Sequence, residues 1–337
     1  MKAGIEALEF VLPERVLDNV ALSAEFENWS PEKIESKTGI RQRHIASEEE
    51  CASDLAFQAA RKLFKSGASE PSKIDYLLLC TQSPDYFLPP TACLLQHRLG
   101  LPTSCGAMDF NLGCSGFVYG LSLAKGLIET AQARRVLLLT AETYSKFIHA
   151  GDKSVRTLFG DAAAATLVEG FETETELIGP FVFGTDGSGA ENLIVPTGGL
   201  RKKTVANAEV IRDENGNDRT VNNLYMNGPE IFNFSVRTVP RSVQALLAKA
   251  GKSMQEIDAF VLHQANGFML EHLRKKLGIS PEKFIVAMAE CGNTVSASIP
   301  CALKQAVSLG KLQAGDLVLL AGFGVGYSWA STLARML

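Results

Sequence analysis

Cys114 lies in a stretch whose residue types suit nucleophilic chemistry, residues 109–116 with the sequence DFNLGCSG. Glycines flank the Cys-Ser pair, and an apolar run with helical spacing, residues 117–128, follows it. A cysteine at the start of a helix faces unpaired N–H groups and the positive end of the helix dipole, which lower its pKa and favour the thiolate. The same pattern is also typical of a small cysteine packed in a core. Partners elsewhere in the chain must decide between the two interpretations.

His263 and Asn293 are the candidate partners. His263 follows an apolar run, residues 257–262, that indicates a buried strand, and Asn293 lies in a Gly-Asn-Thr turn before a helical run. Taken singly, the histidine is typical of a hydrogen-bonded buried residue, and the asparagine is typical of a turn. Taken jointly with Cys114, they predict a catalytic set.

An internal repeat indicates how the chain positions these residues. The segment from residue 74 to residue 101 resembles the segment from residue 257 to residue 279. Each leads through a glycine-bearing turn and a helix to an apolar strand, and each half ends in a further strand; these strands are residues 136–139, 317–320, 162–168 and 329–336. We predict two related α/β halves of about 165 residues, 1–172 and 173–337.

The repeat also predicts that the three candidates converge. Cys114 heads a helix of the first half, and the Asn293 turn precedes the matching helix of the second half. His263 ends the strand that corresponds to the strand ending at Cys80. Active groups of α/β folds commonly lie beyond the carboxyl ends of strands, and two pseudo-symmetric halves bring those ends to one crevice.

Other stretches are less specific. Residues 1–50 suggest a strand and a polar helix around residues 25–37, and residues 52–66 suggest an amphipathic helix. Arg41 and Arg43 beside a turn glycine indicate either an anion-binding loop or a solvated one. Residues 198–223 are polar and rich in turn residues; they indicate a surface excursion that borders a site or a disordered insertion.

Composition excludes several classes of protein. With 337 residues, of which 46% are hydrophobic and 21% charged, the chain has the composition of a globular protein. Its net charge of −4 gives no reason to expect nucleic acid. No apolar run approaches the roughly 20 residues of a membrane-spanning helix, and the N-terminus lacks a signal-peptide pattern, so we expect a cytoplasmic protein without a membrane partner. Seven cysteines without a Cys-x-x-Cys pair suggest neither a zinc site nor a disulfide framework.

Taken together, the motifs resemble those of β-ketoacyl-acyl-carrier-protein synthase III, within the thiolase-fold condensing enzymes. The resemblance covers nearly the whole chain and rests on the stretches 38–41 (TGIR), 43–46 (RHIA), 113–117 (GCSGF), 159–161 (FGD), 263–266 (HQAN), 292–294 (GNT) and 322–326 (GFGVG). It implies a five-layered αβαβα fold made of two pseudo-symmetric halves, and a homodimer.

The resemblance implies an acyltransferase of fatty acid or related biosynthesis. Cys114 would take an acyl group from a CoA or acyl-carrier-protein thioester and pass it to a carbanion made by decarboxylating malonyl-carrier protein. His263 and Asn293 would donate hydrogen bonds to the enolate oxygen, and the backbone N–H groups of Cys114 and Val325 would form the oxyanion hole. The substrates would be CoA or phosphopantetheine thioesters, with no permanently bound cofactor and no metal, and the partner would be acyl-carrier protein.

The same resemblance implies positions for binding the substrate and the carrier. These are Lys33, Lys37, Arg41, Leu88, Lys153, Met226, Asn266, Phe268, Arg274, Lys275 and Lys276.

Several of these positions depart from the family. Lys33 and Lys153 stand where a tryptophan and an arginine stack the CoA adenine in well-known members, and Lys37 stands where an arginine lies near the phosphates. Leu88 replaces a phenylalanine that closes the acyl pocket from the partner subunit, which predicts a longer or branched acyl group. Phe268 replaces an arginine thought to contact the carrier.

The basic triplet at residues 274–276 is open to two interpretations, a docking patch or a solvated helix face. For the whole chain, two interpretations also remain beside the main one. One is a specialised acyltransferase or condensing enzyme of a secondary-metabolite or surface-polymer pathway, suggested by the lysine substitutions and the 198–223 excursion. The other is a catalytically silent scaffold subunit, against which the complete Cys-His-Asn set argues.

Overall fold

The computed structural model describes all residues from Met1 to Leu337. Its first sheet has the strand order β1-β7-β6-β4-β5. Strand β4 runs parallel to both β5 and β6, whereas β7 runs antiparallel to both β6 and β1. The bounds are β1 (Lys2–Val11), β4 (Tyr76–Cys80), β5 (Gly106–Phe110), β6 (Arg135–Glu142) and β7 (Ala162–Phe171).

The second sheet has the strand order β13-β14-β15-β8. Strands β13 and β14 are parallel and the other pairs are antiparallel. The bounds are β8 (Ile178–Thr185), β13 (Ala259–Leu262), β14 (Leu317–Gly324) and β15 (Ser328–Arg335). The strands expected at residues 136–139, 162–168, 317–320 and 329–336 are therefore present as β6, β7, β14 and β15.

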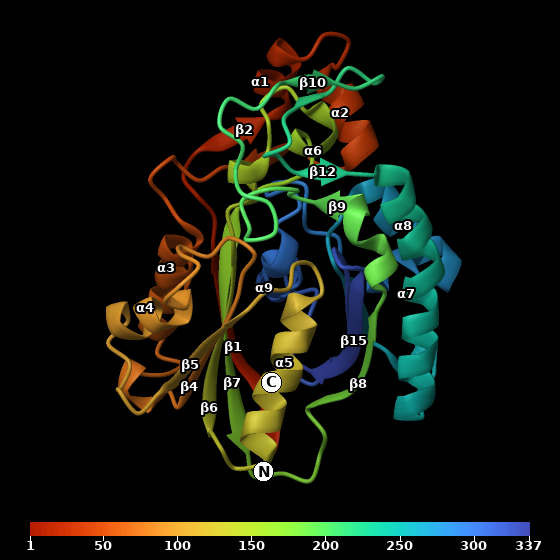
Figure 1. Cartoon of the computed structure of the whole chain (residues 1–337). Coiled ribbons are helices and arrows are strands. Elements are labelled where there is room, and N and C mark those ends of the chain that lie inside the picture. Colours follow the sequence, from red (N-terminus) through yellow and green to blue (C-terminus); the bar gives the residue numbers. More distant parts are fainter.

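Helices form three layers around the two sheets (Figure 1). Helices α5 (Gly116–Glu129) and α9 (Ser298–Ser308) contact strands of both sheets and so lie between them. Helices α3 (Ala52–Lys65) and α4 (Thr91–Arg98) cover the first sheet, and α7 (Gly228–Ala250) with α8 (Gly267–Leu277) covers the second. The expected five-layered αβαβα arrangement is thus confirmed.

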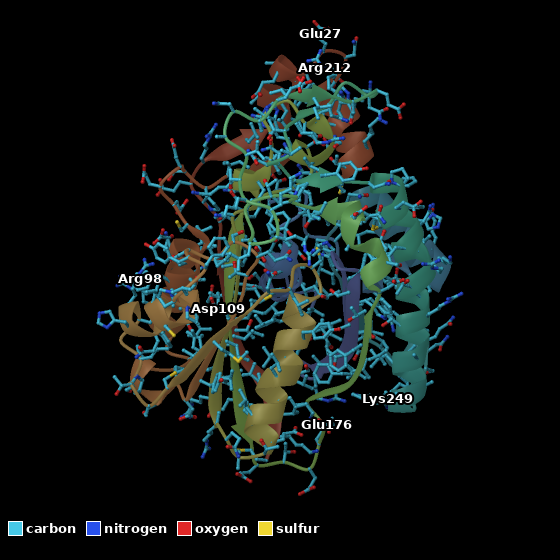
Figure 2. All side chains as sticks on the ribbon, viewed as in Figure 1. Glu27, Arg98, Asp109, Glu176, Arg212 and Lys249 are labelled. Atoms are coloured by element: carbon cyan, nitrogen blue, oxygen red, sulfur yellow. The ribbon has the colours of Figure 1, made fainter.

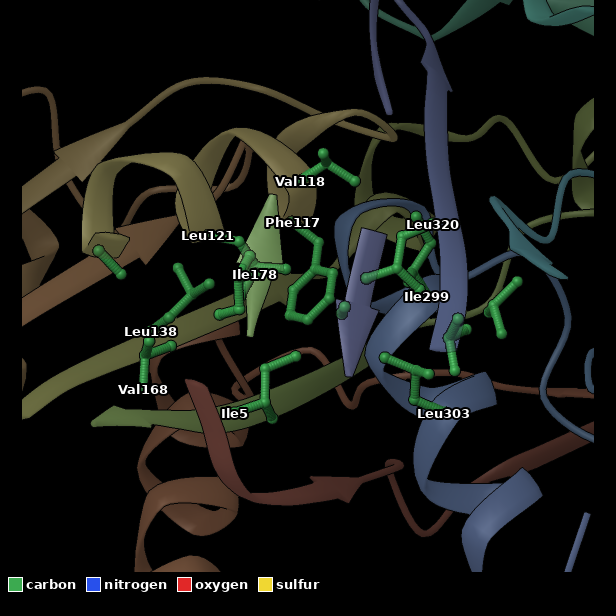
Figure 3. Packing of buried hydrophobic residues seen from close by; sticks show 14 of the residues in the cluster. Ile5, Phe117, Val118, Leu121, Leu138, Val168, Ile178, Ile299, Leu303 and Leu320 are labelled. Carbon is green, nitrogen blue, oxygen red and sulfur yellow. The ribbon is translucent and has the colours of Figure 1, made fainter. Parts of the chain in front are cut away.

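The central core explains why α5 is apolar around most of its surface. Phe117 and Leu121 of α5 pack in one cluster with Leu138 of β6, Ile299 of α9 and Leu320 of β14 (Figure 3). A helix that packs against sheets on two sides needs apolar residues around most of its surface, and only a narrow side of α5, near Leu123, is exposed. Strands β4 and β6 are likewise buried on both faces, which accounts for their continuous apolar sequences.

Smaller elements gather at one end of the molecule, at the top of Figure 1. The polar helix expected around residues 25–37 is two helices separated by the turn before Ser30, which caps the second. The small elements at this end of the molecule are β2 (Val16–Asp18), α1 (Asn19–Glu25), α2 (Pro31–Thr38), β3 (Gln42–His44), α6 (Lys153–Arg156), β9 (Leu193–Ile194), β10 (Ile211–Arg212), β11 (Asp218–Arg219) and β12 (Tyr225–Met226). None of the helices combines the length and apolarity needed to cross a lipid bilayer.

The 198–223 excursion contains a hairpin, β10–β11, attached to the body of the protein. The Asp218 N–H donates to the Gly151 carbonyl at 3.1 Å. Asp213 organises the turn, because its carboxylate accepts hydrogen bonds from the backbone and side chain of Asn217 and from Arg219. The excursion therefore has defined contacts of its own.

Arg43 has a structural position that the sequence did not reveal. Its side chain is fully buried, and its guanidinium donates to the carbonyls of Leu17 and Thr157 and to the Asn19 side chain, at 2.8 to 3.0 Å. The anion-binding interpretation is wrong for Arg43, because the guanidinium is enclosed by protein carbonyls.

Candidate active site

Cys114, His263 and Asn293 line one cavity of about 60 Å³. All three are buried, and the rest of the lining is mostly apolar. The structure therefore brings together the residues that the repeat places at strand and helix ends of the two halves.

Cys114 lies in a tight turn two residues before α5 begins at Gly116. The turn is closed by a hydrogen bond from the Gly116 N–H to the Gly113 carbonyl at 2.8 Å, and the Ser115 and Ser328 hydroxyls are 2.6 Å apart. Asp109, at the start of the same stretch and labelled in Figure 2, instead binds backbone N–H groups at the beginning of α4.

The pKa of Cys114 is raised to about 12, which contradicts the expected thiolate at the helix start. Burial is the largest cause, and the negative charge of Glu142 adds to it. Backbone N–H groups of Val325 and of Cys114 itself oppose the rise by hydrogen bonding to the sulfur. The resting nucleophile is therefore a thiol, and two backbone donors face its sulfur, one from Cys114 itself and one from Val325 after β14.

The end of β14 approaches Cys114 closely because it carries glycines at residues 322 and 324. A Cβ atom added to Gly324 would lie 2.8 Å from the Cys114 sulfur, and one added to Gly322 would lie 2.6 Å from the Cys114 carbonyl oxygen. Glycine is needed where one backbone comes this close to another. Val325 follows directly, and its side chain leaves its N–H free to face the sulfur.

His263 directly follows β13 and is held at both its backbone and its ring. Its N–H donates to the Ala321 carbonyl at 2.8 Å, and its Nδ1 lies 2.7 Å from the Ser298 hydroxyl. Burial lowers the pKa of His263 to about 3, so the ring is neutral. The ring edge also meets Phe323 at a centroid distance of 5.6 Å.

Asn293 is fixed between two parts of the chain. Its N–H donates to the Leu158 carbonyl at 2.9 Å, and its carbonyl accepts from the Gly160 N–H at 3.0 Å. The side-chain Oδ1 accepts the Val295 N–H at 3.0 Å, which leaves the amide NH₂ available to a ligand. Val295 has a φ of 53°, uncommon for a β-branched residue and typical of strain stored at functional sites.

Of the other expected contacts, Met226 and Asn266 line the cavity, whereas Leu88 and Phe268 do not. Asn266 also caps α8, because its Oδ1 accepts the Met269 N–H at 2.8 Å. Leu88 is 81% exposed and Phe268 is 64% exposed. Within one chain Leu88 therefore does not shape the acyl cavity.

Lys33 and Lys37 lie near an aromatic residue that the sequence interpretation missed. Their Nζ atoms lie 5.6 and 5.9 Å from the ring centroid of Trp29. Because residues 29, 33 and 37 are spaced by four, they share one side of α2 and the turn before it. The four-residue spacing is visible in the sequence and could have identified Trp29 as a neighbour of the two lysines.

Lys153 and Arg41 are engaged within the protein. The Lys153 Nζ donates to the carbonyls of Asn215 and Gly216 at 2.6 and 2.9 Å, so this lysine holds the excursion hairpin. Arg41 donates from Nε to Glu290 at 2.7 Å and lies 3.6 Å from Glu35. Neither cation is free in this structure.

The basic triplet on α8 is largely satisfied by its own surroundings. Arg274 donates twice to Glu271 at 2.8 Å and once to the Ile279 carbonyl at 2.7 Å. Lys276 donates to the Val236 carbonyl at 2.7 Å. Lys275 is exposed, and its ammonium lies 3.3 Å from Glu271.

No cluster of three or more His, Cys, Asp or Glu side chains is arranged to hold a metal ion, and all seven cysteines are free thiols.

Known proteins resemble this chain over nearly its whole length. Residues 108–187 match the family 3-oxoacyl-[acyl-carrier-protein (ACP)] synthase III, and residues 247–336 match its C-terminal part. A β-ketoacyl-[acyl-carrier-protein] synthase III from Caldanaerobacter subterraneus subsp. tengcongensis is 34% identical over 333 residues, covering 99% of this chain and 97% of the relative. A β-ketoacyl-[acyl-carrier-protein] synthase III 2 from Halalkalibacterium halodurans is 38% identical over 336 residues, covering 99% and 96%.

Solved structures give the same result. A crystal structure of a 3-oxoacyl-(acyl-carrier-protein) synthase III is 56% identical with a TM-score of 0.99 and covers 100% of both chains. The enzyme from Thermus thermophilus is 38% identical with a TM-score of 0.86 and covers 98% of both chains. The chain belongs to the β-ketoacyl-[acyl-carrier-protein] synthase III family, acyltransferases of the thiolase-fold condensing enzymes.

Proposed function

We propose that this chain condenses an acyl thioester with malonyl-acyl-carrier protein, with loss of carbon dioxide, through an acyl group held on Cys114. The observation that carries the proposal is the single cavity lined by Cys114, His263 and Asn293. The cavity unites a nucleophile with two side chains that can donate hydrogen bonds to an oxygen anion.

In the first half-reaction the Cys114 sulfur attacks the thioester carbonyl. The carbon–sulfur bond of the donor breaks, and the proton lost from Cys114 ends on the departing CoA or pantetheine thiol, so no further reactant is needed. The N–H groups of Cys114 and Val325 already point at the sulfur, a position from which they can hold the carbonyl oxygen as it becomes negative.

In the second half-reaction the bond between the malonyl carboxylate and its α-carbon breaks. Carbon dioxide leaves, and the electron pair forms an enolate whose carbon attacks the acyl group and expels the Cys114 thiolate. The His263 Nε2–H and the Asn293 amide would hold the enolate oxygen. We assign the Nε2–H tautomer because Ser298 accepts the Gln264 N–H at 3.4 Å, which orients its hydroxyl to donate to His263 Nδ1.

We propose that the acyl donor is recognised through its pantetheine arm, with Trp29, Lys33 and Lys37 near the nucleotide when the donor is CoA. Lysines attract phosphate as point charges but cannot form the bidentate contacts of arginine. Trp29 offers an aromatic face beside them. Lys153 is left out of this role because it binds the excursion hairpin.

We further propose a cytoplasmic homodimer that accepts acyl-carrier protein at the α8 face near Lys275. Seven free thiols suit a reducing compartment. Strand β5 is an unpaired sheet edge, and the nearby residues Tyr86, Phe87 and Leu88 are strongly exposed apolar groups. Leu88 can influence an acyl pocket only if a second copy presents it.

Acylation followed by intact mass tests the proposal. The protein is exposed to acetyl to decanoyl groups on CoA and on carrier protein, and peptide mapping locates the adduct. We expect one acyl group on Cys114, none in Cys114→Ser, and condensation with malonyl-carrier protein only in the wild type. Acylation at Cys80 or Cys291 with none at Cys114 would contradict the proposal, as would acylation without condensation.

A further inference from the structure

Glu142 is a fully buried carboxyl group that the proposed reaction does not use. It ends β6 with no exposed surface, and it forms no ion pair with any lysine, arginine or histidine. Its Oε2 accepts the Gln82 N–H at 3.0 Å and the Ser83 hydroxyl at 3.2 Å, and its Oε1 accepts the Ser296 hydroxyl at 2.8 Å. An uncompensated buried carboxylate is costly, so its presence requires an explanation.

The three donors come from segments that shape the site. Gln82 follows β4, and its amide oxygen lies so close to Gly113 that a Cβ there would approach it to 2.5 Å. Ser296 lies three residues after Asn293, in the turn that fixes the Asn293 amide. Glu142 therefore joins a segment of the first half beside the nucleophile to the segment of the second half that carries a hydrogen-bond donor.

The titratable side chains that interact with Glu142 include no lysine, arginine or histidine. They are Cys80 from β4, Cys114 before α5, Tyr144 after β6 and Asp161 before β7. Burial raises the pKa of Glu142 to about 8, against the lowering effect of its three hydrogen bonds. Its ionised form raises the pKa of Cys114, because a second negative charge nearby opposes the thiolate.

We propose that Glu142 is a positioning residue that must keep its proton for Cys114 to be acylated efficiently. In its neutral form it joins the Gln82 and Ser296 segments without placing a charge beside the nucleophile. When it loses its proton to solvent as the pH rises, its negative charge disfavours the Cys114 thiolate. The inference rests on the proposed role of Cys114 as the acylated nucleophile.

A pH profile of single-turnover acylation tests this inference. The rate of Cys114 acylation by an acyl-CoA that labels the wild type is measured by quenched intact mass from pH 6 to pH 9.5. We expect the logarithm of the wild-type rate to rise with pH, as more thiolate forms, and to bend toward a plateau near the ionisation of Glu142. Glu142→Gln keeps the hydrogen-bonding shape without the charge, so its rate should continue to rise and exceed the wild-type rate about tenfold at pH 9.5.

Two further variants keep the test decisive if Glu142→Gln does not fold. Ser296→Ala removes a donor that lowers the pKa of Glu142, so the bend should move to higher pH. Glu9→Gln is the matched control. Glu9, in β1, is also a buried glutamate, but it forms ion pairs with Lys62 of α3 and Lys304 of α9. The pH profile of Glu9→Gln should match that of the wild type.

The outcomes separate this inference from the proposed function. A bend at the wild-type pH in Glu142→Gln, or no shift in Ser296→Ala, would overturn the role of Glu142. Failure of the wild type to acylate Cys114 with any thioester would instead overturn the proposed function.

Discussion

Replacing Gly324 with alanine should slow acylation of Cys114 by about 100-fold. The added Cβ would lie 2.8 Å from the Cys114 sulfur and 2.9 Å from its Cβ. Non-bonded carbon atoms are most favourably separated by about 3.5 to 4.0 Å, so the loop and the cysteine must move apart by roughly 0.7 Å or more. A misplacement of about 1 Å at a reacting centre costs on the order of 100-fold in rate, or about 2.7 kcal/mol in activation free energy.

The assay is the rate of acyl-Cys114 formation by quenched intact mass, with thermal unfolding measured in parallel. We expect Gly324→Ala to lose about 1 to 3 kcal/mol of stability from overpacking and to remain folded. Gly126→Ala is the matched control, because Gly126 lies in α5 with no atom within 4 Å of the added Cβ. It should stabilise the helix by about 0.5 to 1 kcal/mol and acylate at the wild-type rate. Wild-type acylation by folded Gly324→Ala would refute the reasoning.

Two further predictions separate the half-reactions. Asn293→Ala should still form the acyl-enzyme, while carbon dioxide release from malonyl-carrier protein falls by about 100-fold, because one donor to the enolate is lost; lost acylation with intact decarboxylation would reverse the assigned roles. Ser298→Ala should lower carbon dioxide release about tenfold and leave acylation unchanged, because His263 loses the partner that fixes its tautomer. Equal loss of both half-reactions in Ser298→Ala would show that the serine serves only the fold.

Apolar patterning was sufficient to predict two related α/β halves, whereas the five-layered arrangement was implied by the family resemblance. The runs that became β4, β6 and β14 are continuous because both faces of these strands are buried, and α5 is mostly apolar because it packs against both sheets. The duplicated order of runs then placed His263 and Asn293 opposite Cys114. The division into 1–172 and 173–337 stays a prediction; it falls in the connection between β7 and β8.

Individual side-chain contacts between segments that the repeat does not relate could not be predicted. The sequence shows Lys153 as a cation, but its partners lie at Asn215 and Gly216, 62 and 63 residues away. The effect of burial on Cys114 was hidden for the same reason, because a helix start is visible in sequence whereas its enclosure by the glycines of the distant strand β14 is not. Glu142 likewise resembles an ordinary residue at a strand end until its burial is known.

The shared central layer has a consequence for how such a chain can arise. Helix α5 comes from the first half and α9 from the second, yet both pack in one core with strands of both sheets. A polypeptide equal to one half would expose the inner side of its helix and its sheet to water. Association with another copy of itself would bury that surface. Fusion of two such copies end to end leaves each free to change, so that one retains the nucleophile and the other the donors.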